Sequence, residues 1–518
     1  MRLDVSTEPD FATTVARVRL NALPLYDFTV RAKVTGLRPT TTYYYRFVAN
    51  GDVSVVGMAR TAPGPTDANP QVRFAWFTCQ DWKVNHWQAM ALMAAEPDLD
   101  FVVHVGDYIY ETVGGPIADP QEVAHTPIRL PDGRPMPDGG VCANTQEDYR
   151  TLYRTYRSDD RLQALHRQVA MIAIWDDHEF SDDCWQDHQA YTNEAKQETQ
   201  RRRNANQAWA EYMPIDWGDV DFRPDDASYT NIRICRDVTF GSLMQLITTG
   251  ERLYRDGPVV SARTYAEDPH HDPVSGDDAA GSRYFVNLPL LKRSEEQDTA
   301  RLGRAPSMLG PVQTQWWKNT LKASRATWKV WGNEVMLNRL WAQLRQTNPK
   351  ADEVVVIDCD SWDGYPAHKH ELLAFLKQES IRNVIAITGD LHAFQCGIVR
   401  DVAAPAAGTP VVVDFVCAGI SSTSLYTYVR AAWHKTPLAP LVATPVAFDS
   451  FIRVNNPDLR YVDHDAQGYA SATVTSERFS VVFNKVKRLN SDGSTPDLPL
   501  LHRTRLTVFR DSAEVRVD

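Results

Sequence analysis

The chain has 518 residues, of which 43% are hydrophobic, 23% charged and 10% aromatic. This composition supplies material for a large core and excludes a disordered, collagenous or low-complexity protein. The formal net charge of −11 argues against a nucleic-acid partner, because binding to a phosphate backbone depends on clustered Lys and Arg. No apolar stretch approaches the ~18 residues that a membrane-spanning helix needs.

The first 64 residues predict a small β domain of their own. Strands are expected at 18–20, 28–34 and 42–48, where β-branched and aromatic residues alternate or cluster. Short strands at this spacing favour an antiparallel sandwich of the fibronectin or immunoglobulin type, and the pattern starts so late that a first strand or two are expected to be missing. The Pro-rich segment 61–70 cannot be helical and predicts a boundary between domains 1–64 and 65–518.

Beyond residue 65, short apolar runs alternate with longer helical patterns. Runs that are apolar on both faces indicate strands buried on both sides and covered by helices. The expected strands are 72–78, 100–105, 169–175, 328–331, 354–357, 384–388 and 410–416, and the expected helices are 85–95, 147–165 and 194–213. With a β-rich tail at 470–483 and 504–517, the pattern predicts a layered α/β domain.

Four of these apolar runs end in residues that can bind a cation. In open α/β sheets, ligands bind beyond the carboxyl ends of the strands, so we expect these side chains to converge. The alternative is ordinary, because an Asp after a strand is also a common helix N-cap. The residues are Cys79 after the first run, Asp107 and Tyr110 after the second, Asp176, Asp177 and His178 after the third, and Asp390 and His392 after the fourth.

The chemistry of these residue types predicts two cations of different character. Two metal ions about 3.5–4 Å apart clamp a phosphoryl group and activate a bridging water, and Asp107 is the natural bridge between them. A phenolate and a thiolate, from Tyr110 and Cys79, favour Fe(III), whereas the carboxylates around the second ion suit Ca²⁺. The expected nucleophile is therefore a metal-bound hydroxide; the chain has no G-x-S-x-G elbow and no Gly-rich phosphate loop.

Three motifs together resemble the PhoD-type alkaline phosphatases, a family of calcineurin-like metallophosphoesterases related to purple acid phosphatases. They are Gly106-Asp-Tyr-Ile-Tyr-Glu111, Trp175-Asp-Asp-His-Glu179 and Gly389-Asp-Leu-His392. The resemblance covers nearly the whole chain. It implies a layered αββα core, in which two packed β-sheets are flanked by helices, with a small N-terminal β-sandwich.

The resemblance also implies roles for individual residues. It implies Fe(III) on Cys79, Asp107, Tyr110 and His392, and one or two calcium ions on Asp107, Asp177 and Asp390. Asp176 and Asp183 are further candidate metal ligands in the same oxygen-rich region. His178 would lie over the substrate phosphate and stabilise it or protonate the leaving group. Arg154, with Arg157 on the same helix face, is the candidate to reach the phosphate, and a solvated face is the alternative.

Two departures from the family pattern bear on the site. Asp182 and Asp183 stand where the family often has two Asn residues, and the added negative charge should tighten calcium and repel phosphate. The block Gly250-Glu-Arg-Leu-Tyr-Arg255 replaces the usual Asp-Thr-Arg-Gln-Tyr-Arg, so the role of that Asp is open.

The sequence thus predicts a metal-dependent hydrolase of small-molecule phosphoesters, with monoesters as the default substrate. A phosphodiesterase, or a phospholipase D-like hydrolase, is the first alternative. A binding protein with structural metals is the second, and it predicts that replacing His178 changes nothing. The resemblance implies export to the periplasm or the medium, but no basic segment followed by an apolar run opens the chain, so the cytoplasm stays an alternative. The oligomeric state is open.

Overall fold

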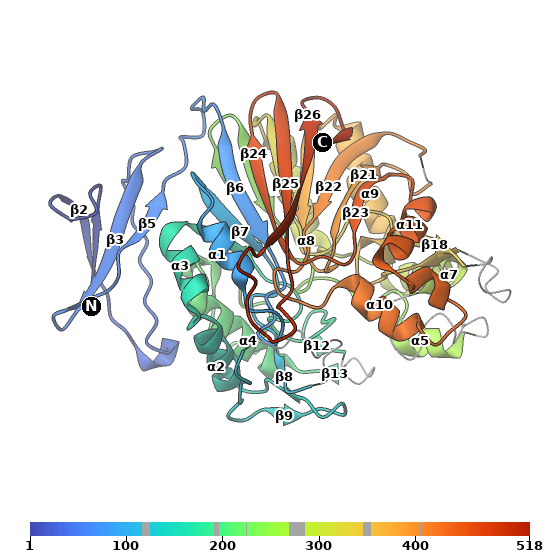
Figure 1. Cartoon of the computed structure of the whole chain (residues 1–518), viewed down its shortest axis with the longest axis horizontal. Helices are drawn as coiled ribbons and strands as arrows, with labels where there is room; N and C mark the ends of the chain where they lie inside the picture. Colours follow the sequence, from blue (N-terminus) through green and yellow to red (C-terminus); the bar gives the residue numbers. More distant parts are fainter. Residues whose placement is uncertain (116–124, 191–195, 224, 269–284, 345–353, 405) are drawn as a thin grey trace.

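The protein is described here by a computed structural model that covers residues 1–115, 125–190, 196–223, 225–268, 285–344, 354–404 and 406–518. Within these residues, the main body contains two seven-stranded sheets (Figure 1). The first sheet has the order β11-β7-β6-β24-β25-β26-β27. Its strands are β6 (Val72–Phe77), β7 (Phe101–Val105), β11 (Met171–Ile174), β24 (Gly468–Val474), β25 (Arg478–Val486), β26 (Leu500–Phe509) and β27 (Val515–Val517).

The second sheet has the order β14-β15-β17-β20-β22-β21-β23. Its strands are β14 (Arg236–Phe240), β15 (Met244–Thr248), β17 (Trp328–Gly332), β20 (Val384–Thr388), β21 (Phe394–Arg400), β22 (Pro410–Val416) and β23 (Leu459–Asp463). Each sheet has a parallel central part, formed by β6, β7 and β11 in the first and by β15, β17, β20 and β22 in the second. The expected ligands follow β6, β7, β11 and β20.

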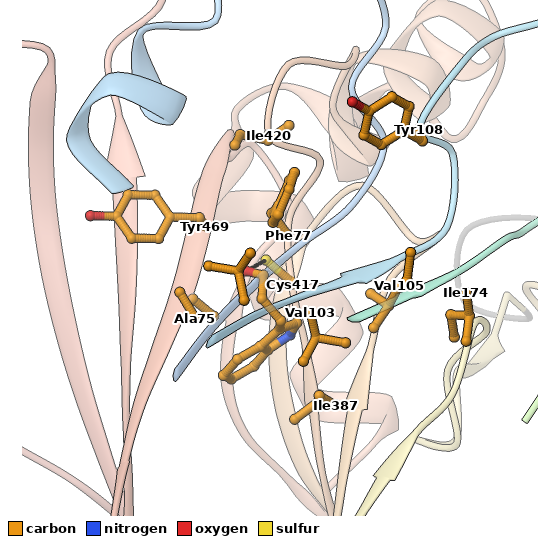
Figure 2. Close-up of a cluster of buried hydrophobic side chains, with 14 of the residues drawn as sticks. Ala75, Phe77, Val103, Val105, Tyr108, Ile174, Ile387, Cys417, Ile420 and Tyr469 are labelled. Atoms are coloured by element: carbon orange, nitrogen blue, oxygen red, sulfur yellow. Dashed lines mark hydrogen bonds between the residues drawn. The ribbon is translucent and has the colours of Figure 1, made fainter. Parts of the chain in front are cut away.

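The main hydrophobic core lies between the two sheets. Phe479 of β25 contacts Trp328 of β17 and Phe415 of β22, with ring centroids 5.7 and 6.2 Å apart. Figure 2 shows side chains from both sheets in this layer, including Val103 of β7 and Ile387 of β20. Because strand residues alternate between faces, Val384 and Ala386 of β20 belong to a different hydrophobic cluster, on the outer face of the second sheet.

Helices cover the outer faces. α7 (Leu288–Leu302), α8 (Gly310–Ala323) and α9 (Pro366–Gln378) contribute apolar side chains to the outer cluster of the second sheet. α1 (Gln88–Ala94), α2 (Gln146–Tyr156), α3 (Asp160–Gln168) and α4 (Thr199–Tyr212) lie on the other side of the molecule, beside β7 (Figure 1). This helix–sheet–sheet–helix order confirms the predicted layered αββα core.

Shorter elements connect the layers. The other α-helices of the described residues are α5 (Ala262–Glu267), α10 (Leu425–Trp433) and α11 (Pro445–Asn455). The short strands are β8 (Thr112–Val113), β9 (Arg134–Pro135), β10 (Val141–Cys142), β12 (His188–Gln189), β13 (Lys196–Gln197), β16 (Val286–Asn287), β18 (Trp341–Gln343) and β19 (Val354–Val356). In the part of the chain that is described, no helix has both the length and the apolar character that crossing a membrane requires.

The N-terminal strands form one antiparallel sheet, not the two packed sheets of the expected sandwich. Its strands, in the described chain, are β1 (Arg2–Ser6), β2 (Thr14–Arg19), β3 (Thr42–Ala49), β4 (Asp52–Val53) and β5 (Gly57–Arg60). The strand predicted at 28–34 was wrong, because this segment docks as coil against the end of α4. Arg31 donates hydrogen bonds to the carbonyls of Ala210 and Met213 and lies 4.6 Å from the Trp217 ring.

Two other sequence expectations differ from the structure. The helix expected over 147–165 is divided into α2 and α3, since the Asp159 carboxylate accepts hydrogen bonds from the backbone amides of Arg161 and Leu162 and starts a new helix. The apolar run at 354–357 forms β19 in a separate three-stranded sheet with β16 and β18, so this run does not contribute to the central sheets.

Candidate metal centre and cavity

Four loops that follow β6, β7, β11 and β20 bring the predicted ligands together. The groups whose ligand atoms all lie within 4.8 Å of one another are Cys79, Asp107 and His392; Asp107, Asp177 and His178; Asp176, Asp177 and Asp390; and Asp177, Asp182 and Asp183. Asp107 belongs to the first two groups and Asp177 to the last three. Asp107 therefore lies between two sides of the site. One side carries the thiol of Cys79 and the imidazole of His392, and the other carries the carboxylates around Asp177, which is the position that a bridging ligand requires.

The backbone at these ligands is unusual. Cys79, Asp107, Asp390 and His392 have φ angles of 53°, 59°, 62° and 57°, in the left-handed region that side chains with a Cβ rarely adopt. Such conformations cost about 1 kcal/mol or more each and cluster where a site requires them. Four strained residues in one place therefore indicate that the side chains are held in position for binding.

Two glycines allow the loops to approach closely. A Cβ on Gly106 would lie 2.4 Å from the Cβ of Asp176, and a Cβ on Gly389 would lie 2.5 Å from Oγ1 of Thr78. Each glycine directly precedes a candidate ligand, Asp107 or Asp390. Steric crowding thus explains why glycine precedes aspartate in both of these sequence motifs.

Tyr110 and His392 complete the first side of the centre. The Tyr110 hydroxyl lies 3.4 Å from Oδ2 of Asp107 and 3.2 Å from Nε2 of His392. His392 Nδ1 lies 2.7 Å from the carbonyl oxygen of Thr423, to which it donates, so Nε2 is directed toward Tyr110. Such a hydrogen bond fixes the tautomer and orientation of a metal-binding imidazole.

The carboxylate side contains a buried cation that the sequence analysis missed. Arg252 is fully buried; its Nε donates to Oδ1 of Asp176 at 2.5 Å, and its Nη2 lies 3.4 Å from Oδ1 of Asp390. It also pairs with Asp360. Arg252 belongs to the Gly250–Arg255 block, so the block supports the ligand loops through its arginine even though its first residue departs from the family pattern.

Asp176 and Asp183 both lie beside Asp177. One oxygen of Asp176 is held by Arg252, and the other, Oδ2, is buried with no hydrogen-bond partner. The backbone amide of Asp183 donates to Oδ2 of Asp177 at 2.6 Å. Both residues are thus within the carboxylate side of the centre.

Glu179, also missed, connects two of the ligand loops. Its carboxylate accepts hydrogen bonds from the backbone amides of Asp107 at 3.1 Å, Tyr108 at 2.5 Å and Asp176 at 2.7 Å. Burial raises the pKa of Glu179 to about 7. A signal was present in the sequence, since Glu179 is the last residue of a motif, but its position gave no hint that its partners are backbone amides.

His178 is oriented by Glu111, a third residue that the sequence analysis did not single out. Nδ1 of His178 lies 2.7 Å from Oε2 of Glu111, and the ring stacks on Tyr110 with centroids 4.0 Å apart. Burial lowers the pKa of His178, but the carboxylates of Glu111, Asp177 and Asp107 outweigh burial and raise this pKa well above its ordinary value. His178 is therefore suited to hold and donate a proton.

The donor set fits a cation centre. Burial, and then the neighbouring acidic groups, raises the pKa of Cys79, Asp107 and Tyr110 well above their ordinary values. So many acidic groups buried together are unfavourable unless a cation offsets their charge. The mixture of thiolate, phenolate, imidazole and carboxylate donors at one place is what two metal ions of unlike preference would need.

Asp107, Tyr110, Asp177, His178, Asp390 and His392 line one side of a cavity with a volume of about 640 Å³. The lining also contains Leu391, residues of α10 and Lys83. Arg154 is not brought to this cavity: its guanidinium donates to Asp27 at 2.7 Å and pairs with Glu147. Arg157 donates to the Tyr108 hydroxyl at 3.2 Å. The prediction that Arg154 binds phosphate is not supported, because Arg154 is outside the cavity lining and is held by Asp27 of the N-terminal segment and Glu147 of α2.

Comparisons with known proteins agree with this arrangement. A family model described as PhoD-like phosphatase matches residues 74–483, and one described as PhoD-like phosphatase, N-terminal domain, matches residues 1–63. Alkaline phosphatase D of Bacillus subtilis (strain 168) is 29% identical over 400 residues, which are 76% of this chain and 58% of that protein. The match thus spans less than two thirds of the relative's length.

Two solved structures share the fold. A structure titled "Structure of PhoD" matches with a TM-score of 0.78 at 24% identity, over 100% of this chain and 84% of that one. The purple acid phosphatase PPD1 of yellow lupin (Lupinus luteus) matches with a TM-score of 0.51 at 11% identity, over 98% of this chain and 69% of that one.

Proposed function

Because the chain belongs to the PhoD-like phosphatase family, we propose that it hydrolyses phosphoesters at the centre described above, with small phosphomonoesters as the default substrates. The observation that supports this most is that Asp107, Asp177 and His392 line one cavity, with Cys79 grouped beside Asp107 and His392. Family membership implies a metal-dependent enzyme, and the donor set fits that requirement.

We propose Fe(III) on the side formed by Cys79, Asp107, Tyr110 and His392, and calcium on the side formed by Asp107, Asp177 and Asp390. Asp176 and Asp183 are candidates for a further calcium. Cations bound there would acidify a water and neutralise the charge on the phosphate oxygens.

Tyr110→Phe tests the iron assignment, because a phenolate on ferric iron absorbs visible light. The purified protein should be coloured, and the variant should lose that colour. Zinc alone on elemental analysis would contradict the proposed ions.

In this proposal His178 donates the proton that the leaving alcohol needs. Glu111 holds Nδ1, which leaves Nε2 as the ring nitrogen free to donate, and His178 lines the cavity. His178→Ala should reduce turnover by about 10²–10⁴-fold, the usual contribution of a general acid. A binding protein with structural metals predicts no effect of this change.

A phosphodiesterase or phospholipase D-like hydrolase is the second candidate. Asp182 lies 3.6 Å from Nε2 of His178, and negative charge beside the phosphate position disfavours a dianionic monoester more than a monoanionic diester. Turnover of p-nitrophenyl phosphate and of bis(p-nitrophenyl) phosphate by the metal-loaded protein separates the two. Faster turnover of the bis-ester would replace the monoester proposal.

From the family resemblance we also infer that the protein acts outside the cytoplasm, in the periplasm or the medium. Recovery of the protein in the extracellular or periplasmic fraction of its source cells would support this location, and recovery in the cytoplasmic fraction would contradict it.

A further inference from the structure

The cavity at the metal centre has two chemically different sides. One side bears the ionisable groups of Asp107, Tyr110, Asp177, His178, Asp390 and His392, and the other is apolar. The apolar side is formed by Leu391, Leu425, Val429, Ala432 and Phe285, with the ring of Tyr428. A volume of about 640 Å³ is in the range of sites that enclose a drug-sized ligand, so a phosphoryl group on the ionisable side leaves room for the rest of an ester.

Helix α10 fixes the apolar side next to the metal ligands. The backbone amide of Leu425, the first residue of α10, donates to the carbonyl of His392 at 3.2 Å. The ring of Tyr428 lies 6.0 Å from the ring of His392, centroid to centroid. The apolar surface therefore adjoins His392, next to the position where the phosphate would be bound.

Tyr428 is the exposed member of this surface. Its side chain is 49% exposed, whereas Leu425 and Val429 on the same helix are 3% and 6% exposed. An aromatic ring that is half exposed inside a cavity, with buried aliphatic side chains around it, offers a face for another apolar group.

The charges around the cavity disfavour an ionic group at this position. Asp81, Asp138 and Asp182 belong to the lining, and Lys83 is the one Lys or Arg among the described lining residues. Lys83 lies 3.8 Å from Asp81, which partly neutralises it. A second anionic group on the substrate would thus meet carboxylates without a matching cation.

We infer that α10 is a specificity surface, on which Tyr428 and its aliphatic neighbours bind an uncharged, apolar ester group of the substrate while the phosphoryl group lies at the metal centre. This inference rests on the proposed function, because the phosphoryl position defines where the ester group extends. It predicts that phosphoesters of aromatic or alkyl alcohols bind better than esters of small polar alcohols.

Affinities of phosphonates test the inference without the effect of leaving-group reactivity on the rate. Methylphosphonate and phenylphosphonate are titrated calorimetrically into the metal-loaded protein, and hydrolysis of p-nitrophenyl phosphate is measured in parallel. Phenylphosphonate should bind at least about tenfold more tightly, since the ring removes additional apolar surface from water. Equal dissociation constants for the two compounds would overturn the inference, whereas failure of hydrolysis would count against the proposed function instead.

Variants of α10 identify the surface. The test quantity is the dissociation constant of methylphosphonate divided by that of phenylphosphonate. Tyr428→Ser should reduce this ratio roughly fivefold. Tyr428→Phe should keep it, because the ring and not the hydroxyl makes the contact. Val429→Asp should abolish the ratio. Arg430→Ser is the matched control, since Arg430 is an exposed residue of the same helix outside the cavity lining, and it should leave both constants unchanged. A Tyr428→Ser protein that keeps the full ratio would contradict the assignment.

Discussion

At the scale of single residues, the pair formed by Glu111 and His178 makes the most specific prediction. The Glu111 carboxylate raises the pKa of His178, so Glu111→Gln should lower that pKa. If His178 acts in its protonated form, activity is lost as the pH rises through this pKa. The alkaline limit of the pH–kcat profile should therefore move to lower pH in the variant.

A matched control separates this effect from general damage. Glu147→Gln also removes one carboxylate, but Glu147 is exposed and pairs with Arg154 away from the cavity. Its pH profile should match that of the wild type. An unchanged alkaline limit in Glu111→Gln would show that His178 is not the group that the profile reports.

The candidate ligands could be predicted from the sequence because each lies just after the carboxyl end of a buried strand, three of them in one sheet and one in the other. Cys79, Asp107, Asp177 and Asp390 are recognisable by this position alone, once the strands are identified. Glu179 and Arg252 could not be predicted in the same way. Their roles depend on contacts across the fold with backbone amides and with carboxylates of other loops, and no spacing in the sequence records such contacts.

At the scale of secondary-structure elements, the layer between the sheets is the main source of stability. Phe479 of β25 is fully buried and packs against aromatic rings from both sheets. Phe479→Ala should lower the free energy of unfolding by about 3–5 kcal/mol. Phe509→Ala on the neighbouring strand β26 is the control, because Phe509 is 45% exposed and should cost roughly 0.5 kcal/mol or less. Urea denaturation of the three proteins measures the difference, and equal midpoints for the two variants would contradict this description of the core.

Most strands of the core could be predicted from apolar runs, but the boundaries of the N-terminal elements could not. The segment 28–34 has the residue types of a strand, yet Arg31 makes its contacts with the end of α4. Side chains of 32–37 instead pack on the sheet that contains β1 and β3. Tertiary contacts of this kind override local β preference.

At the scale of the whole molecule, Arg154 tests the contact between the N-terminal segment and the catalytic body. Its side chain is 41% exposed and pairs with Asp27 and Glu147. Arg154→Ala should therefore change the free energy of unfolding by only about 0–1 kcal/mol and leave kcat within about twofold of the wild type. Steady-state kinetics and urea denaturation check both values; a loss of kcat like that of His178→Ala would restore Arg154 to the active site.

Stability should also depend on pH in opposite ways with and without metal. In the metal-free protein, burial raises the pKa of Glu179 to about 7 and that of Asp107 well above its ordinary value. Between pH 4.5 and 7 the folded chain then holds protons that the unfolded chain releases, so the free energy of unfolding falls as the pH rises. Bound cations displace protons from their ligands, so the stabilisation by metal should grow with pH.

Urea denaturation at about pH 5 and pH 8, with chelator or with iron and calcium, measures both trends. A metal-free protein that is more stable at the higher pH would contradict the pKa shifts.

The central claim is that four separate loops hold a pair of cations on which phosphoester hydrolysis depends. The most direct test is hydrolysis of p-nitrophenyl phosphate by protein stripped with a chelator and then reloaded with iron and calcium, with the metal content measured at each step. We predict that turnover disappears with the metals and returns only when both ions are restored. Full turnover by protein shown to contain no metal would contradict the claim.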